Sequence, residues 1–268
     1  MAILTICRES GVGGEEIGKA VAEKLGYEYV ARDVIFKEIG EHGEKWVKWG
    51  KEMDDHKPSL WERFDLSFAG FVALKESIMY RHALKNNVVL MGRGGNWMLS
   101  DFPHALRIRI MAPLETRIEN IVKKEAIDTE TAREMIEEGD AERAAYLKAI
   151  YHKDWKKPKY YDIVFDTAKL SQDEVVQMII DELQAKDKKF TPAVGEKLAQ
   201  IALASKVKAE IITGLNSFIP TLEVSHDGKQ IVLKGTIHKA EERKQVLEIA
   251  RRIAGSTPIM DKLHYRGA

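Results

Sequence analysis

The chain has 268 residues, 42 basic and 42 acidic side chains, and one cysteine. This length allows one large domain or two modest ones, and it can bury a core without a disulfide or structural metal. Balanced charge provides no overall field toward nucleic acid or anionic lipid, so no nucleic-acid partner is expected. The single cysteine, Cys7, excludes an internal disulfide and is expected to be a small buried residue. We find no signal-peptide pattern and no apolar run near the roughly 20 residues of a membrane span, so we expect a cytoplasmic protein.

In the first 184 residues, apolar runs typical of buried strands alternate with helical patterns. Strands are predicted at 2–7, 27–30, 88–91, 105–111 and 160–167, and helices at 14–25, 34–40, 60–86, 112–125, 129–138, 141–154 and from the Ser171 cap onward. The polar stretch 41–58 shows no clear pattern. Alternating strands and helices predict an α/β fold, a parallel sheet flanked by helices. Ligands of such sheets bind beyond the carboxyl ends of the strands.

The pattern changes at the charged, proline-containing stretch 185–196, which is typical of a linker. Beyond it we predict a helix to about residue 212, a hairpin with a two-residue turn at Asp227-Gly228, a helix over 239–254 and a last strand. The sequence therefore predicts two domains, 1–184 and 197–268, of which the second is a small α+β module.

A glycine cluster follows the first predicted strand and precedes a helix. Such a turn exposes backbone N–H groups at the positive end of the helix dipole, where phosphate binds well. Glu16 stands where the dinucleotide pattern G-x-G-x-x-G, started at Gly11, requires its last glycine. The pattern G-x-x-x-x-G-K-[ST], laid over residues 8–15, keeps only Gly13 at its fixed positions.

The other fixed positions of that phosphate loop are substituted. Arg8 stands for its first glycine, Gly14 for its lysine and Glu15 for its hydroxyl residue. Arg8 could restore the positive charge from the other side of the loop. Alternatively, Glu15 and Glu16 could stabilise the helix dipole without any phosphate, so the loop is either a phosphate cradle or a tight turn.

Two further basic features are candidates for phosphate contacts. Arg93, in the second glycine turn "GRGG", could bind a second phosphate or pair with a carboxylate. Arg143, Lys148 and Lys153 lie on a polar helix, which is either a solvated face or a lid that closes over the transferred phosphoryl group.

Four motifs, in order, resemble the cytidylate kinase-like family over residues 1–184. They are "ITICRESGVGGEEIG…AEKLGYEYVARDVI", "VVLMGRGGNWMLSDFPHALRIRIMAPLETRI", "GDAERAAY" and "YYDIVFDTAKL". The family is related to cytidylate kinases, which are P-loop nucleoside monophosphate kinases. The resemblance implies a P-loop NTPase-type fold and an ATP-dependent, Mg²⁺-assisted phosphotransferase that acts on CMP or dCMP.

The resemblance also implies roles for individual residues. ATP phosphates would be held by the loop, comprising Arg8, Ser10, Gly11, Val12, Gly13, Gly14, Glu15 and Glu16. The acceptor nucleotide would meet Arg32, Asp33 and Arg93, and catalysis would rest on Arg93, Arg117, Asp140 and Arg143. The resemblance assigns no metal ligands.

The chain departs from true cytidylate kinases at Gly14, where they carry the loop lysine, and at Met91, where they carry an acid. Members of the -like family often lack both and typically read "GSGGREIG" at the loop, so Glu15 replaces an arginine. These departures leave two alternatives: a nucleotide-binding sensor that controls the second domain, and an interaction scaffold.

The C-terminal segment "IVLKGTIHKAEERKQVLEIARRIAGSTPIMDKLHY" resembles a BON domain, over about residues 197–266. Such domains are mostly linked to membrane or partner binding and not to catalysis. The resemblance implies a protein or lipid partner for this module.

Overall fold

The computed structural model describes residues 1–55, 66–92, 94–215, 219 and 221–266, without the side chains of residues 49 and 51–55. Its contacts divide the chain into two compact units, which are described separately. Among the described residues, the first unit holds 1–34, 53–55, 85–92 and 94–190, and the second holds 35–52, 66–84, 191–215, 219 and 221–266.

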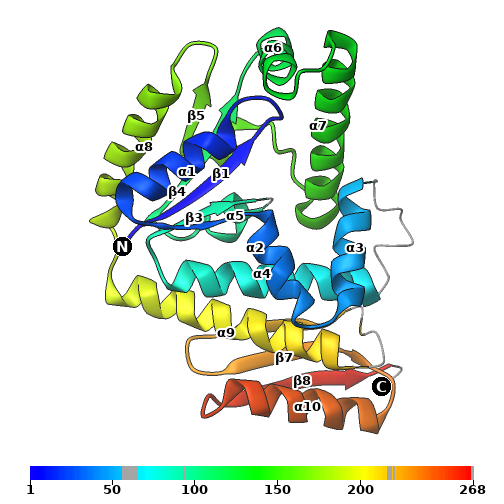
Figure 1. The fold of residues 1–268 in the computed structure, drawn as a ribbon. Coiled ribbons are helices and arrows are strands. Elements are labelled where there is room, and N and C mark those ends of the chain that lie inside the picture. The colour runs from blue at the N-terminus through cyan, green and yellow to red at the C-terminus, as the bar shows by residue number, and fades with distance from the viewer. Residues whose placement is uncertain (56–65, 93, 216–218, 220, 267–268) are drawn as a thin grey trace. The chain divides into compact units, whose positions relative to one another are not determined.

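The first unit is built on a five-stranded parallel sheet with the order β2-β3-β1-β4-β5 (Figure 1). Its strands are β1 (Ile3–Arg8), β2 (Glu28–Val30), β3 (Val88–Met91), β4 (Ala105–Met111) and β5 (Ile163–Asp166). β1 lies in the centre, where Ile3 pairs with Val88 on one side and with Ala105 on the other. All five predicted strands of this half are confirmed, as is the predicted α/β fold class.

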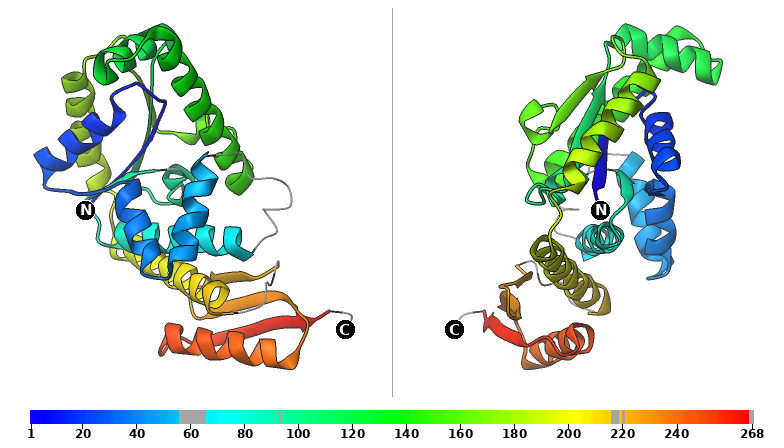
Figure 2. Two further views of the ribbon diagram at one scale, coloured as in Figure 1. Left: turned by 45° about the vertical axis from the view of Figure 1, so that its right-hand side comes forward. Right: turned by 90° about the vertical axis from the view of Figure 1, so that its left-hand side faces the viewer.

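Two helices, α1 (Gly14–Leu25) and α8 (Gln172–Asp187), lie side by side against the sheet (Figures 1 and 2). Their fully buried Ile17 and Ile179 join Leu4 and Ile108 of the sheet in one apolar core. The capping box predicted at Ser171 is present and fixes the start of α8. Because α1 begins directly after β1, this core fixes the intervening glycine loop at the carboxyl edge of the sheet.

Three further helices of this unit are α5 (Gly95–Met98), α6 (Leu114–Glu125) and α7 (Thr129–Tyr151), and η2 (Pro158–Tyr160) is a short 3-10 turn. The two helices predicted over 129–138 and 141–154 are one continuous helix, so that prediction is wrong. Gly139 stays helical within it although glycine weakens a helix. A Cβ there would lie 3.0 Å from Oγ of Ser10, so glycine permits a close approach between α7 and the loop.

The second unit contains a three-stranded sheet with the order β6-β7-β8, in which β7 pairs antiparallel with β6 and parallel with β8. The unit boundary divides α2 and α3, and most of each lies in this unit. The elements are α2 (Arg32–Gly40), α3 (Glu44–Asp55), α4 (Leu66–Leu84), α9 (Pro192–Gly214), β6 (Glu223–His226), β7 (Ile231–Ile237), α10 (Ala240–Ala254) and β8 (Ile259–Tyr265). α9 packs along α4, and Val246 and Ala250 of α10 are fully buried.

Within the stretch 185–196, α8 continues to Asp187 and α9 begins at Pro192, and its role as a linker stays a prediction. One expectation for the hairpin needs correction. The predicted hairpin is confirmed, but its loop has four residues, because Oδ1 of Asp227 accepts hydrogen bonds from N–H of Lys229 and of Gln230, each at 3.0 Å. The division into domains 1–184 and 197–268 stays a prediction.

Candidate phosphate-binding site

The glycine loop joins β1 to α1 and lines a cavity of about 410 Å³. All eight loop residues predicted to hold phosphate line it: Arg8, Ser10, Gly11, Val12, Gly13, Gly14, Glu15 and Glu16. Gly13, the N-cap of α1, has φ 72° and ψ 20°, a left-handed conformation that glycine adopts without strain. Gly13 has no side chain that could cap the first turn of α1, so the backbone N–H groups of that turn can bind an anion.

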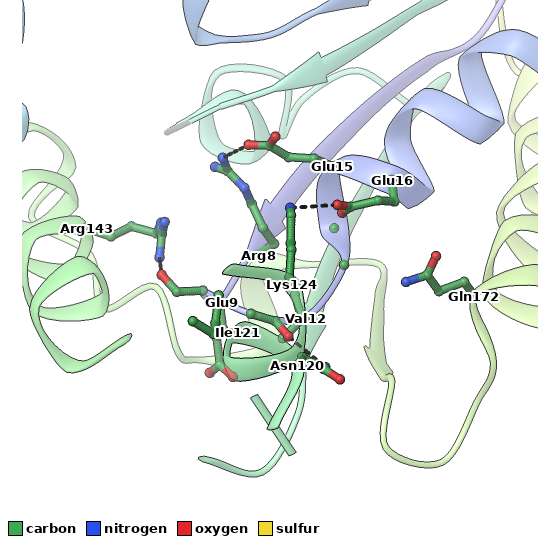
Figure 3. Close-up of a pocket in the computed structure, with 14 residues that line it drawn as sticks. Arg8, Glu9, Val12, Glu15, Glu16, Asn120, Ile121, Lys124, Arg143 and Gln172 are labelled. Carbon is green, nitrogen blue, oxygen red and sulfur yellow. Dashed lines mark hydrogen bonds and ion pairs between the residues drawn. The ribbon is translucent and has the colours of Figure 1, made fainter. Parts of the chain in front are cut away.

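The packing of Arg8 explains why residue 14 is glycine. A Cβ on Gly14 would lie 2.8 Å from Cγ and 2.9 Å from Cβ of Arg8, closer than real Cβ contacts. A lysine at position 14 would therefore compete with Arg8 for the same space. The Arg8 guanidinium reaches the rim of the cavity and donates a hydrogen bond to Oε1 of Glu15 at 3.2 Å (Figure 3).

One face of α6 lies against the loop. Arg117, Asn120, Ile121 and Lys124 are spaced along this face at helical intervals. The Asn120 amide donates to the carbonyl of Gly11 at 2.8 Å, and a Cβ on Gly11 would lie 2.8 Å from the Arg117 carbonyl. The close backbone approach at Gly11 excludes any larger residue, so α6 and the loop hold each other in place.

Asp140 of α7 connects the loop to two arginines. One of its carboxylate oxygens accepts from the Ser10 backbone N–H at 3.2 Å and from Arg143 at 3.0 Å, and the other accepts from Arg117 at 2.6 Å. The side chains of these three charged residues are only 10–12% exposed. Arg143 also donates to Oγ of Ser10 at 3.5 Å. Three of the four residues to which the resemblance gives a catalytic role, Arg117, Asp140 and Arg143, thus come together at the loop, and that role stays a prediction.

Glu9 forms a second buried anchor, which the sequence did not indicate. Its carboxylate accepts from Arg109 of β4 at 2.5 Å and from the backbone N–H of Ala112 at 3.4 Å, and it lies 3.6 Å from Nε of Arg117. A buried carboxylate needs such partners because burial penalises its charge. Glu9 is therefore committed to holding the loop on β4 and α6.

Lys124 is a further cation of the cavity, and sequence reasoning missed it. Its Nζ donates to Oε1 of Glu16 at 2.9 Å. Figure 3 shows Lys124 reaching from α6 to Glu16 at the start of α1, while Gln172 points in from α8. The spacing of seven residues from Arg117 on one helix face was the available signal. The charges of the cavity-lining cations Arg8, Lys124 and Arg143 are balanced by those of Glu9, Glu15 and Glu16.

The remaining predicted site residues lie elsewhere. Arg93 lies outside the described residues, so its predicted phosphate contact is untested. Arg32 and Asp33 form the first turn of α2, directly beyond the carboxyl end of β2, and neither lines the cavity. They stay candidates for the acceptor nucleotide.

Cys7 is 5% exposed, which confirms the prediction of a buried residue. Burial raises the pKa of its thiol above the usual value, although a hydrogen bond with Tyr161 acts in the opposite direction. A thiol in this state is a poor nucleophile. Within the described part of the chain, no helix is long and apolar enough to cross a membrane, and no three acidic, histidine or cysteine side chains gather as a metal site.

The profile of the cytidylate kinase-like family matches residues 3–169. A cytidylate kinase of Methanocaldococcus jannaschii is 34% identical over 192 residues, covering 68% of this chain and 99% of the relative. A cytidylate kinase of Methanopyrus kandleri is 27% identical over 185 residues, covering 66% of this chain and 90% of the relative.

Among solved structures, an uncharacterized protein from Eubacterium ventriosum matches with a TM-score of 0.55 and 22% identity, covering 69% of this chain and 98% of the other. This likeness supports the fold alone. The profile spans more than half of the chain, and the relative from Methanocaldococcus jannaschii is matched over nearly its whole length. The chain therefore belongs to the cytidylate kinase-like family.

Proposed function

We propose that the protein transfers the γ-phosphoryl group of ATP to CMP or dCMP. The observation that carries this proposal is the glycine loop at the carboxyl edge of the parallel sheet, where Asp140 holds Arg117 and Arg143 beside Ser10. The cytidylate kinases of Methanocaldococcus jannaschii and Methanopyrus kandleri, matched along most of their length, suggest the acceptor class.

The chemistry would be electrostatic and positional. Phosphoryl transfer spreads negative charge over the equatorial oxygens of the moving group, and fixed cations stabilise that charge. Arg143 reaches Ser10 Oγ from α7, so its guanidinium lies beside the position expected for the donor phosphates. Arg117 forms ion pairs with Asp140 and Glu9 and donates a hydrogen bond to the Ser10 carbonyl. It would therefore fix the position of the loop.

The donor set at the loop fits Mg²⁺, which prefers oxygen ligands and takes several of them from water and phosphate. Glu15 replaces the hydroxyl residue of the standard loop, and its side chain is about half exposed at the cavity. It would hold the ion together with the ATP phosphates. When bound, Mg²⁺ would neutralise charge on the transferred group.

The test is a coupled phosphotransfer screen with ATP and Mg²⁺ against CMP, dCMP, UMP, AMP and GMP. A nucleotide-binding measurement on the same protein runs beside it. We expect turnover with CMP or dCMP above the other acceptors. Tight binding of nucleotide without transfer to any acceptor would refute the kinase function and favour a nucleotide-binding sensor.

We propose separately that residues 197–268 are a BON-like module that binds a protein or lipid partner. The support is the sheet β6-β7-β8 with α10, which matches the strand, helix and strand order of that resemblance. Vesicle co-sedimentation of the whole protein, with neutral and anionic lipids compared, tests the lipid form of this proposal. If the protein sediments with neither vesicle composition, the lipid form of the proposal is refuted.

A further inference from the structure

The cavity contains a lysine that comes from α6 and not from the loop position where a phosphate loop usually carries one. A Cβ on Gly14 would lie 2.8 Å from Cγ of Arg8, so a lysine in the loop at this position would require Arg8 or the loop to move. Lys124 enters the same cavity from α6. Asn120, one turn earlier on that face, is bonded to the Gly11 carbonyl and keeps this part of α6 on the loop.

The partner of Lys124 is an anion placed at the start of α1. The Glu16 carboxylate accepts from Lys124 Nζ at 2.9 Å and also interacts with its own backbone N–H. Burial raises the pKa of Glu16, but the hydrogen bond from Lys124 and the backbone interaction outweigh it, so the net pKa is below the usual value. Glu16 is therefore a carboxylate at neutral pH, held by one N–H of the first helical turn and one ammonium group.

A phosphate on this loop would seek the same donors. Helix N-termini bind phosphate through first-turn N–H groups, and lysine binds it as a compact charge. The side chains of Lys124 and Glu16 are 60% and 46% exposed. Ion pairs this exposed contribute little to stability, so a dianionic phosphate can displace the carboxylate at small cost.

Building on the proposed function, we propose that Lys124 is the donor-phosphate lysine of this enzyme, supplied by α6 in place of loop position 14. In the ligand-free protein, the Glu16 carboxylate forms an ion pair with Lys124 at the place where a phosphate would bind. ATP binding then replaces the Glu16 carboxylate by a phosphate oxygen, and no covalent bond forms or breaks in this exchange.

Isothermal titration calorimetry with Mg²⁺ and an ATP analogue with an imido group between its β- and γ-phosphates measures donor binding without turnover. CMP is titrated separately. The variants are Lys124→Met, Lys124→Arg and Glu16→Gln, with Lys123→Met as matched control, because Lys123 is the exposed neighbour outside the cavity. Losing a charge-assisted bond predicts about 10- to 100-fold weaker analogue binding for Lys124→Met. Lys124→Arg and Lys123→Met should stay near wild type.

Glu16→Gln should change the affinity for the ATP analogue in the opposite direction. It removes the competing anion, so analogue binding should tighten by about threefold or more. CMP affinity should be unchanged in every variant. If Lys124→Met binds the analogue as Lys123→Met does, or if Glu16→Gln weakens binding, the inference is wrong while the kinase proposal stands. A wild-type protein that binds neither the analogue nor CMP would overturn both.

Discussion

Asp140→Asn removes the charge that holds two buried arginines at the loop. Asp140 pairs with Arg117 at 2.6 Å and with Arg143 at 3.0 Å, and the three side chains are 10–12% exposed. Breaking a buried ion pair commonly destabilises a protein by about 3–5 kcal/mol, because the remaining charge loses its partner. Arg117 keeps Glu9 as a second acidic neighbour, and asparagine can still accept the Ser10 N–H, so we expect the low end, about 3 kcal/mol.

The assay is thermal unfolding of the full chain by scanning calorimetry. For a protein of this size, about 3 kcal/mol corresponds to a Tm that is lower by about 6–12 °C in the transition of the first unit. The matched control is Glu137→Gln on the same helix, which breaks an exposed pair with Arg133 at 3.8 Å. That change should shift the unfolding free energy by less than about 0.5 kcal/mol. Equal shifts for both variants would refute the view that Asp140 is a structural centre of the site.

Three further predictions concern catalysis, pH dependence and domain autonomy. Arg143→Ala and, from the family resemblance, Arg93→Ala should each lower kcat/KM by about 100-fold or more in the coupled assay, because fixed positive charges stabilise the transferred phosphoryl group. The control Arg133→Ala should stay near wild type, and an equal loss of kcat/KM in all three variants would refute this prediction. His104 is fully buried between Phe102 and Phe190, and burial lowers its pKa to about 4. Its neutral form stabilises the fold above pH 6.5, so as pH falls from 6.5 to 4 the urea unfolding free energy should drop by about 3 kcal/mol, and His104→Phe should flatten that drop. A fragment of residues 197–268 should show cooperative melting by circular dichroism. If it does not, the domain boundary lies elsewhere, and the loss of the packing between α9 and α4 would explain why the fragment is unstable.

Local signals predicted the elements of the chain well. The alternation over 105–111 gives β4 with the same bounds, and the Ser171 and Glu174 spacing gives the cap of α8. Both depend on neighbours in sequence, which a single sequence displays. The break expected inside 129–154 is absent, because α7 runs through Gly139 without interruption. A Cβ at this position would lie 3.0 Å from Ser10 Oγ, a long-range contact that the local pattern could not indicate.

The candidate site was predicted in part, for a physical reason. The glycine loop depends on a local strand-to-helix pattern, so its residues could be named. The contacts of Glu9 with Arg109, and of Glu16 with Lys124, join residues 100 and 108 positions apart. No local pattern reports such pairs. The conflict between a lysine at position 14 and the Arg8 side chain is likewise a packing effect, which only the three-dimensional structure shows.

Gly139 shows how stability and activity can oppose each other in this fold. Alanine in its place would favour the helix by about 1 kcal/mol, and a search for stabilising substitutions would select it. Its Cβ would, however, lie 3.0 Å from the Ser10 hydroxyl oxygen, which would have to move by a few tenths of an ångström. Arg143 also bonds this hydroxyl, so the shift would reach the arginine held by Asp140. An engineered chain stabilised at this position would therefore gain thermostability but disturb the loop that we propose binds phosphate.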